Sequence, residues 1–187
     1  MKSYLHITES GYDPEKGKSI KDPYLGDQPS LGACMPNIRR LVVPGDRIFT
    51  MSGKIAGVQQ FIIGGFEVAE KISALAAFRR FPEQRLRLVD GQVAGNIIVD
   101  SRGRQHPLDD HEKFANRISN YIVGRDPIAL STRREIEQAR AETLYVLRQL
   151  LRKNGDSPIK VMGRWCRFDE QQTRELTDWL LDIKNGH

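Results

Sequence analysis

"SLGACMPNIRRLVVPGDRIFTMSGK", residues 30–54, is the stretch that decides the fold. It passes from a loop of small residues through a proline into the adjacent arginines Arg39 and Arg40, and then through a Pro-Gly-Asp turn into a short apolar run. Proline suits the first position of a helix, and Pro-Gly-Asp is typical of a turn. The stretch therefore predicts a helical turn over 37–40 and a strand over 47–51.

Short strands and long connections are predicted on both sides of this stretch. A loop rich in Gly, Pro, Asp and Lys covers 9–30, and loops of this length are uncommon in compact domains unless they are functional or disordered. Gly64-Gly65 indicates a bulge or a close backbone approach. Apolar patterns predict strands at 3–8, 58–72, 96–100, 119–124 and 126–131, and helices at 73–81 and 109–118. This order indicates an α+β fold with a small mixed or barrel-like sheet.

The C-terminal part predicts two longer helices with clear start signals. Thr132 and Glu135 form a capping box at the first, and Asp169 caps the second with Gln172 three residues later. Both helices have one apolar face and are expected to flank the sheet. The predicted apolar positions are Ile136, Ala139, Thr143, Val146, Leu147 and Leu150 in the first helix, and Leu176, Trp179, Leu180 and Ile183 in the second.

Length and charge restrict the class of protein. The chain has 187 residues and a formal net charge of +5. This length predicts a single domain over 1–187, with 132–187 as flanking helices. A moderate positive excess favours nucleic acid, an acidic membrane surface or an anionic small molecule as the partner. Neither a dinucleotide-binding glycine motif nor a P-loop is present, so no cofactor is predicted.

The cysteines and the N-terminus indicate a compartment. Cys34 and Cys166 lie far apart, and neither belongs to a Cys-x-x-Cys motif, which fits a reducing environment. The N-terminal residues contain no apolar run suited to a signal peptide, and no apolar stretch is long enough to cross a bilayer. We therefore expect a cytoplasmic protein with no membrane partner.

Cations on either side of the strand at 47–51 form the first candidate site. Arg39 and Arg40 precede this strand and Lys54 follows it. Guanidinium groups bind phosphate through two parallel hydrogen bonds, whereas an ammonium acts as a point charge. The three side chains would hold a phosphate if they face one groove; the alternative is an ordinary solvated surface.

Small and aromatic residues extend this candidate. Tyr12 and Tyr24 lie in the early loop and are suited to stacking on a base; the alternative is that they cover the end of the sheet. Ser52 and Gly53 end the strand and would offer polar contacts to the edge of a base. The predicted ligand-binding residues are Tyr12, Tyr24, Asn37, Arg39, Arg40, Ser52, Gly53 and Lys54.

Neither a metal site nor a catalytic residue is assigned. The run HPLDDHE at 106–112 does not have a recognised zinc spacing, and Asp109 and Asp110 are better explained as acids at a helix N-terminus. Cys34 lies in a loop without a nucleophile-elbow pattern around it, so a hydrolytic role has no support.

The opening stretch resembles the family of nucleotide modification associated domains, whose members are encoded near DNA base-modification genes. The order of small motifs also resembles the wider PUA-like group, which includes the EVE and ASCH domains. These are small β-barrels with flanking helices that accommodate a modified or flipped base. The similarity is best over 1–72. The residues that carry it are Cys34, Pro36, Ile38, Arg39, Gly45, Asp46, Ser52 and Gly53.

The resemblance implies a function that the composition alone does not. We expect a PUA-like small mixed β-barrel with flanking helices that binds nucleic acid or a nucleotide, with DNA favoured, and recognises a modified base in a bacterial or phage modification or defence setting. Two alternatives stay open. One is an enzyme acting on a nucleotide or base through Cys34 or an aspartate, and the other is a protein-interaction module that uses the terminal helices. The oligomeric state stays open.

Overall fold

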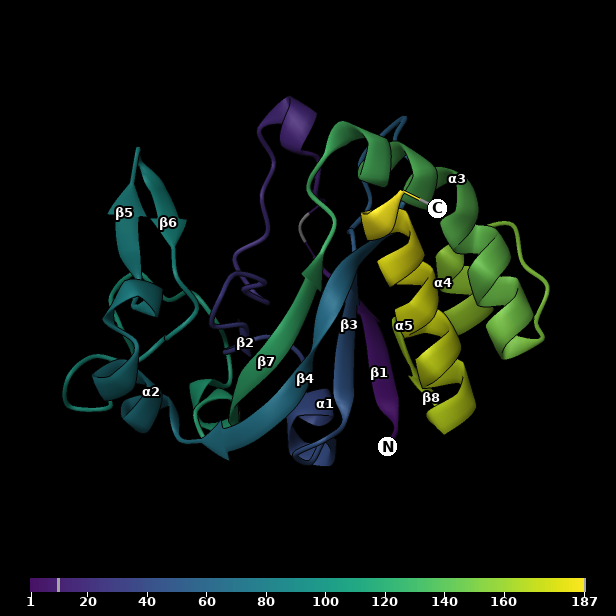
Figure 1. Ribbon diagram of the computed structural model, residues 1–187. Helices are drawn as coiled ribbons and strands as arrows, with labels where there is room; N and C mark the ends of the chain where they lie inside the picture. The colour runs from purple at the N-terminus through teal and green to yellow at the C-terminus, as the bar shows by residue number, and fades with distance from the viewer. Residues whose placement is uncertain (10, 187) are drawn as a thin grey trace. The chain divides into compact units, whose positions relative to one another are not determined.

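The computed structural model describes residues 1–9 and 11–186, apart from the side chain of Glu15. The protein is α+β, as expected, with a six-stranded mixed sheet in the order β2-β7-β4-β3-β1-β8 and a separate β5–β6 hairpin (Figure 1). The strands are β1 (Ser3–Ile7), β2 (Ser30–Leu31), β3 (Arg47–Met51), β4 (Ile62–Ile72), β5 (Arg87–Val89), β6 (Gln92–Ala94), β7 (Tyr121–Ala129) and β8 (Trp165–Phe168). The helices are α1 (Pro36–Leu41), α2 (Ala74–Arg80), α3 (Arg133–Leu151), α4 (Pro158–Met162) and α5 (Glu170–Asn185).

Within the described part of the chain, the six strands do not close into a barrel. Their order begins at β2 and ends at β8, and no pairing joins these two strands among the described residues. A barrel has no edge strands, whereas this open order leaves two. The expected mixed sheet is therefore present in an open form.

The chain divides into two compact units. Unit 1 comprises Met1–Ile20, Asp46–Phe66 and Pro127–His187, and unit 2 comprises Lys21–Gly45 and Glu67–Asp126. Each unit is assembled from separate segments of the chain. A single domain over the whole chain stays a prediction.

Unit 1 is built around β1. This strand runs parallel to β3, from Ser3 opposite Arg47 to Ile7 opposite Met51, and antiparallel to β8. The strand predicted at 47–51 has the observed bounds of β3, because a turn and a small-residue end delimit it on both sides. By contrast, β8 was not predicted.

Helices α3 and α5 pack side by side (Figure 1). They bury most of the apolar faces that their spacing predicts, but Val146 and Trp179 are only partly buried. Both predicted N-terminal boxes are confirmed: Thr132 with Glu135 at α3, and Asp169 with Gln172 at α5. Hydroxyl groups on these helices also bond to the strands. The Oγ1 atom of Thr173 lies 2.9 Å from Ser3 Oγ. On α3, another buried threonine hydroxyl accepts a hydrogen bond from a β4 amide.

The glycine pair in β4 allows close contacts between strands, as predicted. Gly64 has φ 151°, and an added Cβ would collide with the carbonyl of Ile128. At Gly65 an added Cβ would collide with the carbonyl of Ile48. Any side chain at these positions would force the neighbouring backbone apart.

Unit 2 has its own apolar core. The rings of Phe81 and Tyr121 stack with their centroids 6.4 Å apart. The Tyr121 hydroxyl donates to Gln84 Oε1 at 2.5 Å and its oxygen lies 2.9 Å from Asn96 Oδ1, so its polar end is satisfied inside the core. The buried residues of this core are Ala74, Ala77, Phe81, Ile97, Val99, Tyr121 and Val123.

Three element predictions in this part of the chain were wrong. Residues 96–100 form isolated bridges instead of a strand, and the segment 109–118 contains only a 3₁₀ turn at Phe114–Arg117. Lys113 takes a left-handed conformation, φ 55°, immediately before this turn, which prevents an α-helix from running through it. The two strands predicted at 119–124 and 126–131 are one continuous strand, β7, which begins in unit 2 and ends in unit 1.

Candidate functional site

The predicted edge after β3, which comprises Ser52, Gly53 and Lys54 and is called the β3 edge below, lies in unit 1. The amide of Ser52 donates to Phe61 O at 2.9 Å, and its hydroxyl accepts from Phe61 N at 3.0 Å. The amide of Gly53 donates to Thr8 Oγ1 at 3.0 Å. Both amides are therefore bonded within the unit. The expectation that Ser52 and Gly53 present open backbone donors to a ligand is corrected here, and Lys54 alone is exposed.

The early loop lies beside the β3 edge, as its predicted role requires. An added Cβ at Gly11 would collide with the side chain of Ile55 and would lie 3.6 Å from Gly53 O. The next residue, Tyr12, places its ring centroid 6.0 Å from that of Phe61 at an interplanar angle of 45°. Tyr12 is half-buried, so the structure brings one predicted aromatic side chain to the β3 edge.

Arg140, a partly buried arginine on α3, joins this cluster and was missed in the sequence. The guanidinium carbon of Arg140 lies 5.3 Å from the centroid of Phe61, and its Nη2 lies 3.3 Å from Asp13 Oδ1. Asp13 is only 2% exposed. The Nε and Nη2 atoms of Arg140 are buried and donate no hydrogen bond to any described residue. The sequence contained one signal for this position. Arg140 lies four residues after Ile136 and three before Thr143, and this spacing places it on the apolar face of α3.

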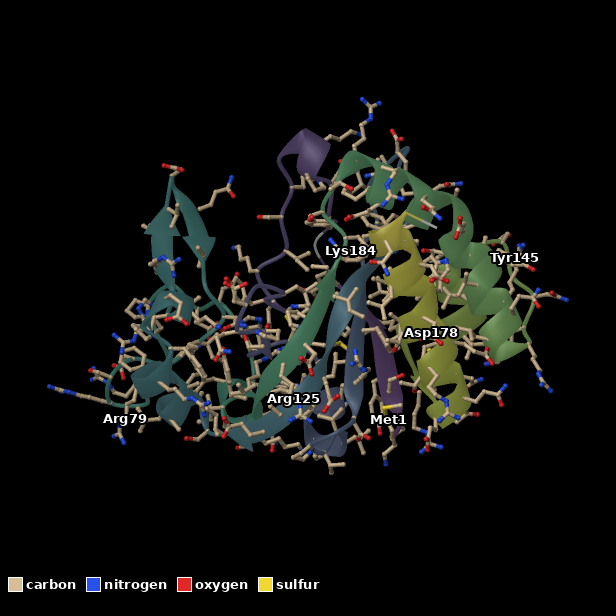
Figure 2. The ribbon with its side chains drawn as sticks, viewed as in Figure 1. Met1, Arg79, Arg125, Tyr145, Asp178 and Lys184 are labelled. Carbon is tan, nitrogen blue, oxygen red and sulfur yellow. The ribbon has the colours of Figure 1, made fainter. Side chains whose placement is uncertain are left out.

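The charges around Tyr12 keep its phenol protonated. Burial, followed by the negative charge of Glu135, raises the pKa of Tyr12. Glu135 is itself buried at the start of α3, and burial acts to raise its pKa. Hydrogen bonds from the amides of Ser131 and Thr132, together with Lys184 at 3.2 Å, outweigh this effect and lower the pKa (Figure 2). Tyr12 can therefore donate a hydrogen bond throughout the physiological pH range.

In unit 2, the loop that precedes α1 is held by one carboxylate. Asp22 accepts hydrogen bonds from three successive amides, those of Gly32 at 2.7 Å, Ala33 at 2.9 Å and Cys34 at 2.6 Å. Asn96 Nδ2 donates to the same carboxylate at 3.1 Å. Multiple amide donors to one carboxylate fix the loop conformation strongly because each bond is charge-assisted. The loop is therefore ordered by its own residues.

Arg39 has a structural role, which corrects its interpretation as a phosphate ligand. Its side chain is 1% exposed, and it donates to the carbonyls of Cys34 at 2.8 Å and Ala33 at 3.0 Å. It also donates to Arg117 O at 3.1 Å and Asn120 O at 2.7 Å. Burial lowers the pKa of Arg39 to about 10. Four of its five N–H groups are used in this way, so it is committed to the backbone rather than to an external anion.

The other predicted residues of unit 2 are accessible. Arg40 and Asn37 are exposed on α1, and the Arg40 carbonyl accepts a hydrogen bond from Lys71 Nζ at 2.9 Å. Tyr24 is 43% exposed, and its ring lies against Gly26, where an added Cβ would collide with the phenol. A ring held from one side and open to solvent on another is suited to stacking. Arg40, Asn37 and Tyr24 therefore stay candidates.

The acidic run in unit 2 forms a local cluster. Ligand atoms of Asp109, Asp110 and His111 lie within 4.8 Å of one another. His111 Nδ1 lies 2.6 Å from Asp109 Oδ1, and Gln105 Nε2 donates to Asp109 Oδ2 at 2.8 Å. No helix begins at these acids, so the helix-terminus explanation was wrong. Asp109 is instead held by two neighbouring side chains.

Comparison of the chain with protein-family models, with curated proteins and with solved structures found no match. Among the residues described, no helix combines the length and the apolar character needed to cross a bilayer. A functional interpretation therefore rests on the arrangement of side chains within each unit.

Proposed function

We propose that the protein is a PUA-like module, related to the nucleotide modification associated domains, that binds nucleic acid or a nucleotide and recognises a modified base. DNA is the favoured partner, because the resemblance is to proteins encoded near DNA base-modification genes.

The observation that carries the proposal is the guanidinium of Arg140, which lies over the ring of Phe61 and has two buried nitrogen atoms that donate no hydrogen bond to a described residue. Asp13 neutralises its charge from 3.3 Å, but donors without an acceptor are costly to bury, so an added acceptor would be bound favourably. A base carbonyl or a phosphate oxygen supplies such an acceptor. Tyr12 and Phe61 would give the ring of a base an apolar surface, and Lys54 would attract its phosphate.

Unit 2 supplies accessible groups of the same chemistry. Arg40 offers an exposed guanidinium for a phosphate, and Tyr24 offers an exposed ring for a base. Asn37, which lies on α1 with Arg40, adds an exposed hydrogen-bonding side chain. Arg39 is excluded from this set because its donors are occupied within unit 2.

A binding screen with modified and unmodified oligonucleotides at two salt concentrations tests the proposal. Variant Arg140→Met keeps the length of the side chain and removes its donors, and we expect it to weaken binding at least about tenfold. Arg174→Ala is the matched control, because Arg174 is exposed and already paired with Glu170 at 2.8 Å. Equal binding by wild type and Arg140→Met would contradict the role of Arg140. No binding to any oligonucleotide or mononucleotide would contradict the proposed function.

An enzyme acting on a nucleotide or base is the second candidate. Cys34 is partly exposed, and its amide is held by Asp22, so the thiol sits on an ordered loop. Incubation with modified nucleotides, followed by mass spectrometry, tests this candidate. A new product that disappears in Cys34→Ser would favour it, and unchanged nucleotides would exclude it for the substrates used.

A further inference from the structure

Strand β8 presents an exposed tryptophan at the edge of the sheet. Trp165 is 38% exposed, although large aromatic side chains are usually buried. Its ring centroid lies 6.2 Å from that of Tyr4, a residue of β1 that is only 2% exposed. The buried tyrosine therefore supports the tryptophan from within the sheet. Because β8 is the last strand in the sheet order, no further strand of the described sheet covers its outer edge.

Positive charge surrounds this tryptophan. The segment 148–167 contains six cations and one acid, Asp156, whose carboxylate is paired with Lys160 at 2.7 Å. Arg164 and Arg167 are exposed, and neither has a carboxylate within 4.0 Å in the described part of the chain. Arg167 lies two residues after Trp165 and shares its face of the strand. These three residues, Arg164, Trp165 and Arg167, are called the β8 patch.

The β8 patch begins at the same end of unit 1 as the β3 edge. The amide of Ile7 donates to Arg164 O at 3.1 Å, and the amide of Thr8 donates to Met51 O at 3.0 Å. The ends of β3 and β1 and the start of β8 therefore lie in one row across three neighbouring strands. Adjacent strands are about 4.8 Å apart, so β8 is about 10 Å from β3. A single DNA strand can span a gap of this size with a few nucleotides, so the two places can contact one strand.

We propose that the β8 patch binds single-stranded DNA that flanks the base held at the β3 edge, which makes a strand rather than a free nucleotide the ligand of this protein. This inference rests on the proposed function and specifies its substrate class. Trp165 would stack on one base, and the two arginines would contact the neighbouring phosphates. Aromatic stacking of this kind requires an unpaired base, so duplex DNA would not use the patch.

Fluorescence anisotropy with a thymidine oligomer of about 12 nucleotides, compared with a mononucleotide competitor, tests the inference. Trp165→Ala should weaken oligomer binding about tenfold or more and leave the mononucleotide affinity unchanged. Trp165→Leu keeps apolar bulk against Tyr4 and should show the same loss, which separates stacking from folding. Arg167→Ala should reduce the slope of log K against log salt by about 0.7, whereas Trp165→Ala should leave that slope unchanged.

Two controls match these variants. Tyr145 is 63% exposed on the outer side of α3, so Tyr145→Ala removes an aromatic ring outside the patch (Figure 2). Arg174→Ala removes an exposed guanidinium from α5. Both should bind the oligomer as wild type does.

The outcomes separate the two proposals. Oligomer binding that Trp165→Leu and Arg167→Ala leave unchanged would overturn the β8 patch while leaving the proposed function intact. Loss of mononucleotide binding as well as oligomer binding in Trp165→Leu would assign the tryptophan to the base site itself and overturn the flanking role. Binding to an RNA oligomer but not to DNA would overturn the choice of DNA. Absence of all binding in wild type would instead contradict the proposed function.

Discussion

Replacement of Arg39 by alanine should destabilise the fold far more than replacement of its neighbour Arg40. Arg39 is buried and donates to four backbone carbonyls, two of which lie 78 and 81 residues further along the chain. Alanine would remove all four donors and leave these carbonyls in a poorly hydrated space. Arg40 is exposed, so its truncation changes little in the folded state.

The magnitude follows from the number and kind of these bonds. A hydrogen bond from a charged donor contributes about 1.5–3 kcal/mol, but burial of the guanidinium offsets part of the sum. Disruption of a buried charged network by loss of one partner typically costs about 3–5 kcal/mol, and we expect Arg39→Ala to fall in this range. For a chain of this size, that corresponds to a fall in Tm of about 6–20 °C. Arg40→Ala should stay within about 0.5 kcal/mol of wild type.

Urea unfolding followed by circular dichroism measures both variants, and thermal unfolding gives the Tm. Arg39→Lys keeps a positive charge but cannot reproduce the planar set of donors, so it should recover little of the lost stability. If Arg39→Ala lost less than about 1 kcal/mol, or if both alanine variants lost the same amount, the structural role assigned to Arg39 would be refuted.

Two further predictions concern ionisable groups of unit 1. The pKa of Glu135 is lowered in the folded state, so its stabilising effect is complete above about pH 4.5 and is lost as the pH falls through the folded pKa. The free energy of unfolding of Glu135→Gln, measured by urea titration, should therefore be about 1–3 kcal/mol lower than that of wild type at pH 7. The difference should be smaller at pH 3. A difference that does not change with pH would count against this ionic role. Burial raises the pKa of the Cys166 thiol to about 12, so in Cys34→Ser the rate of alkylation should keep rising beyond pH 10. A plateau near pH 9.5 would show an ordinary thiol instead.

Local signals predicted the elements that depend on nearby residues. Strand β3 was found with its observed bounds because a Pro-Gly-Asp turn precedes it and Ser-Gly follows it. The starts of α3 and α5 were found because a capping box is complete within four residues. The glycine pair in β4 was similarly informative, since two glycines in an apolar strand indicate a bulge or a close backbone approach, and the structure shows the close approach.

The features that were missed depend on partners distant in the sequence. Strand β8 has only four residues, and one of them is charged, so its sequence does not indicate a strand. Its extended conformation depends on pairing with β1. Propensity alone does not reveal such pairing. Arg39 was predicted to hold a phosphate because arginine is mostly exposed, and only the fold brings Arg117 and Asn120 to its guanidinium. Arg140 was overlooked because its neighbours on α3 formed a convincing apolar face.

The candidate site was accordingly predicted in part. The sequence indicated Tyr12, Lys54 and the β3 edge, and the structure places Tyr12 beside that edge within unit 1. The amides of Ser52 and Gly53 proved to be bonded internally, because Thr8 and Phe61 come from segments whose contacts with this edge have no local signature.

Salt dependence of oligonucleotide binding tests the central claim most directly. Wild type and Lys54→Ala should be titrated with a single-stranded oligonucleotide carrying a modified base, over a range of salt concentrations. Loss of one phosphate contact should lower the slope of log K against log salt by about 0.7, while the preference for the modified base persists. An unchanged slope, or binding that does not respond to salt at all, would contradict the account.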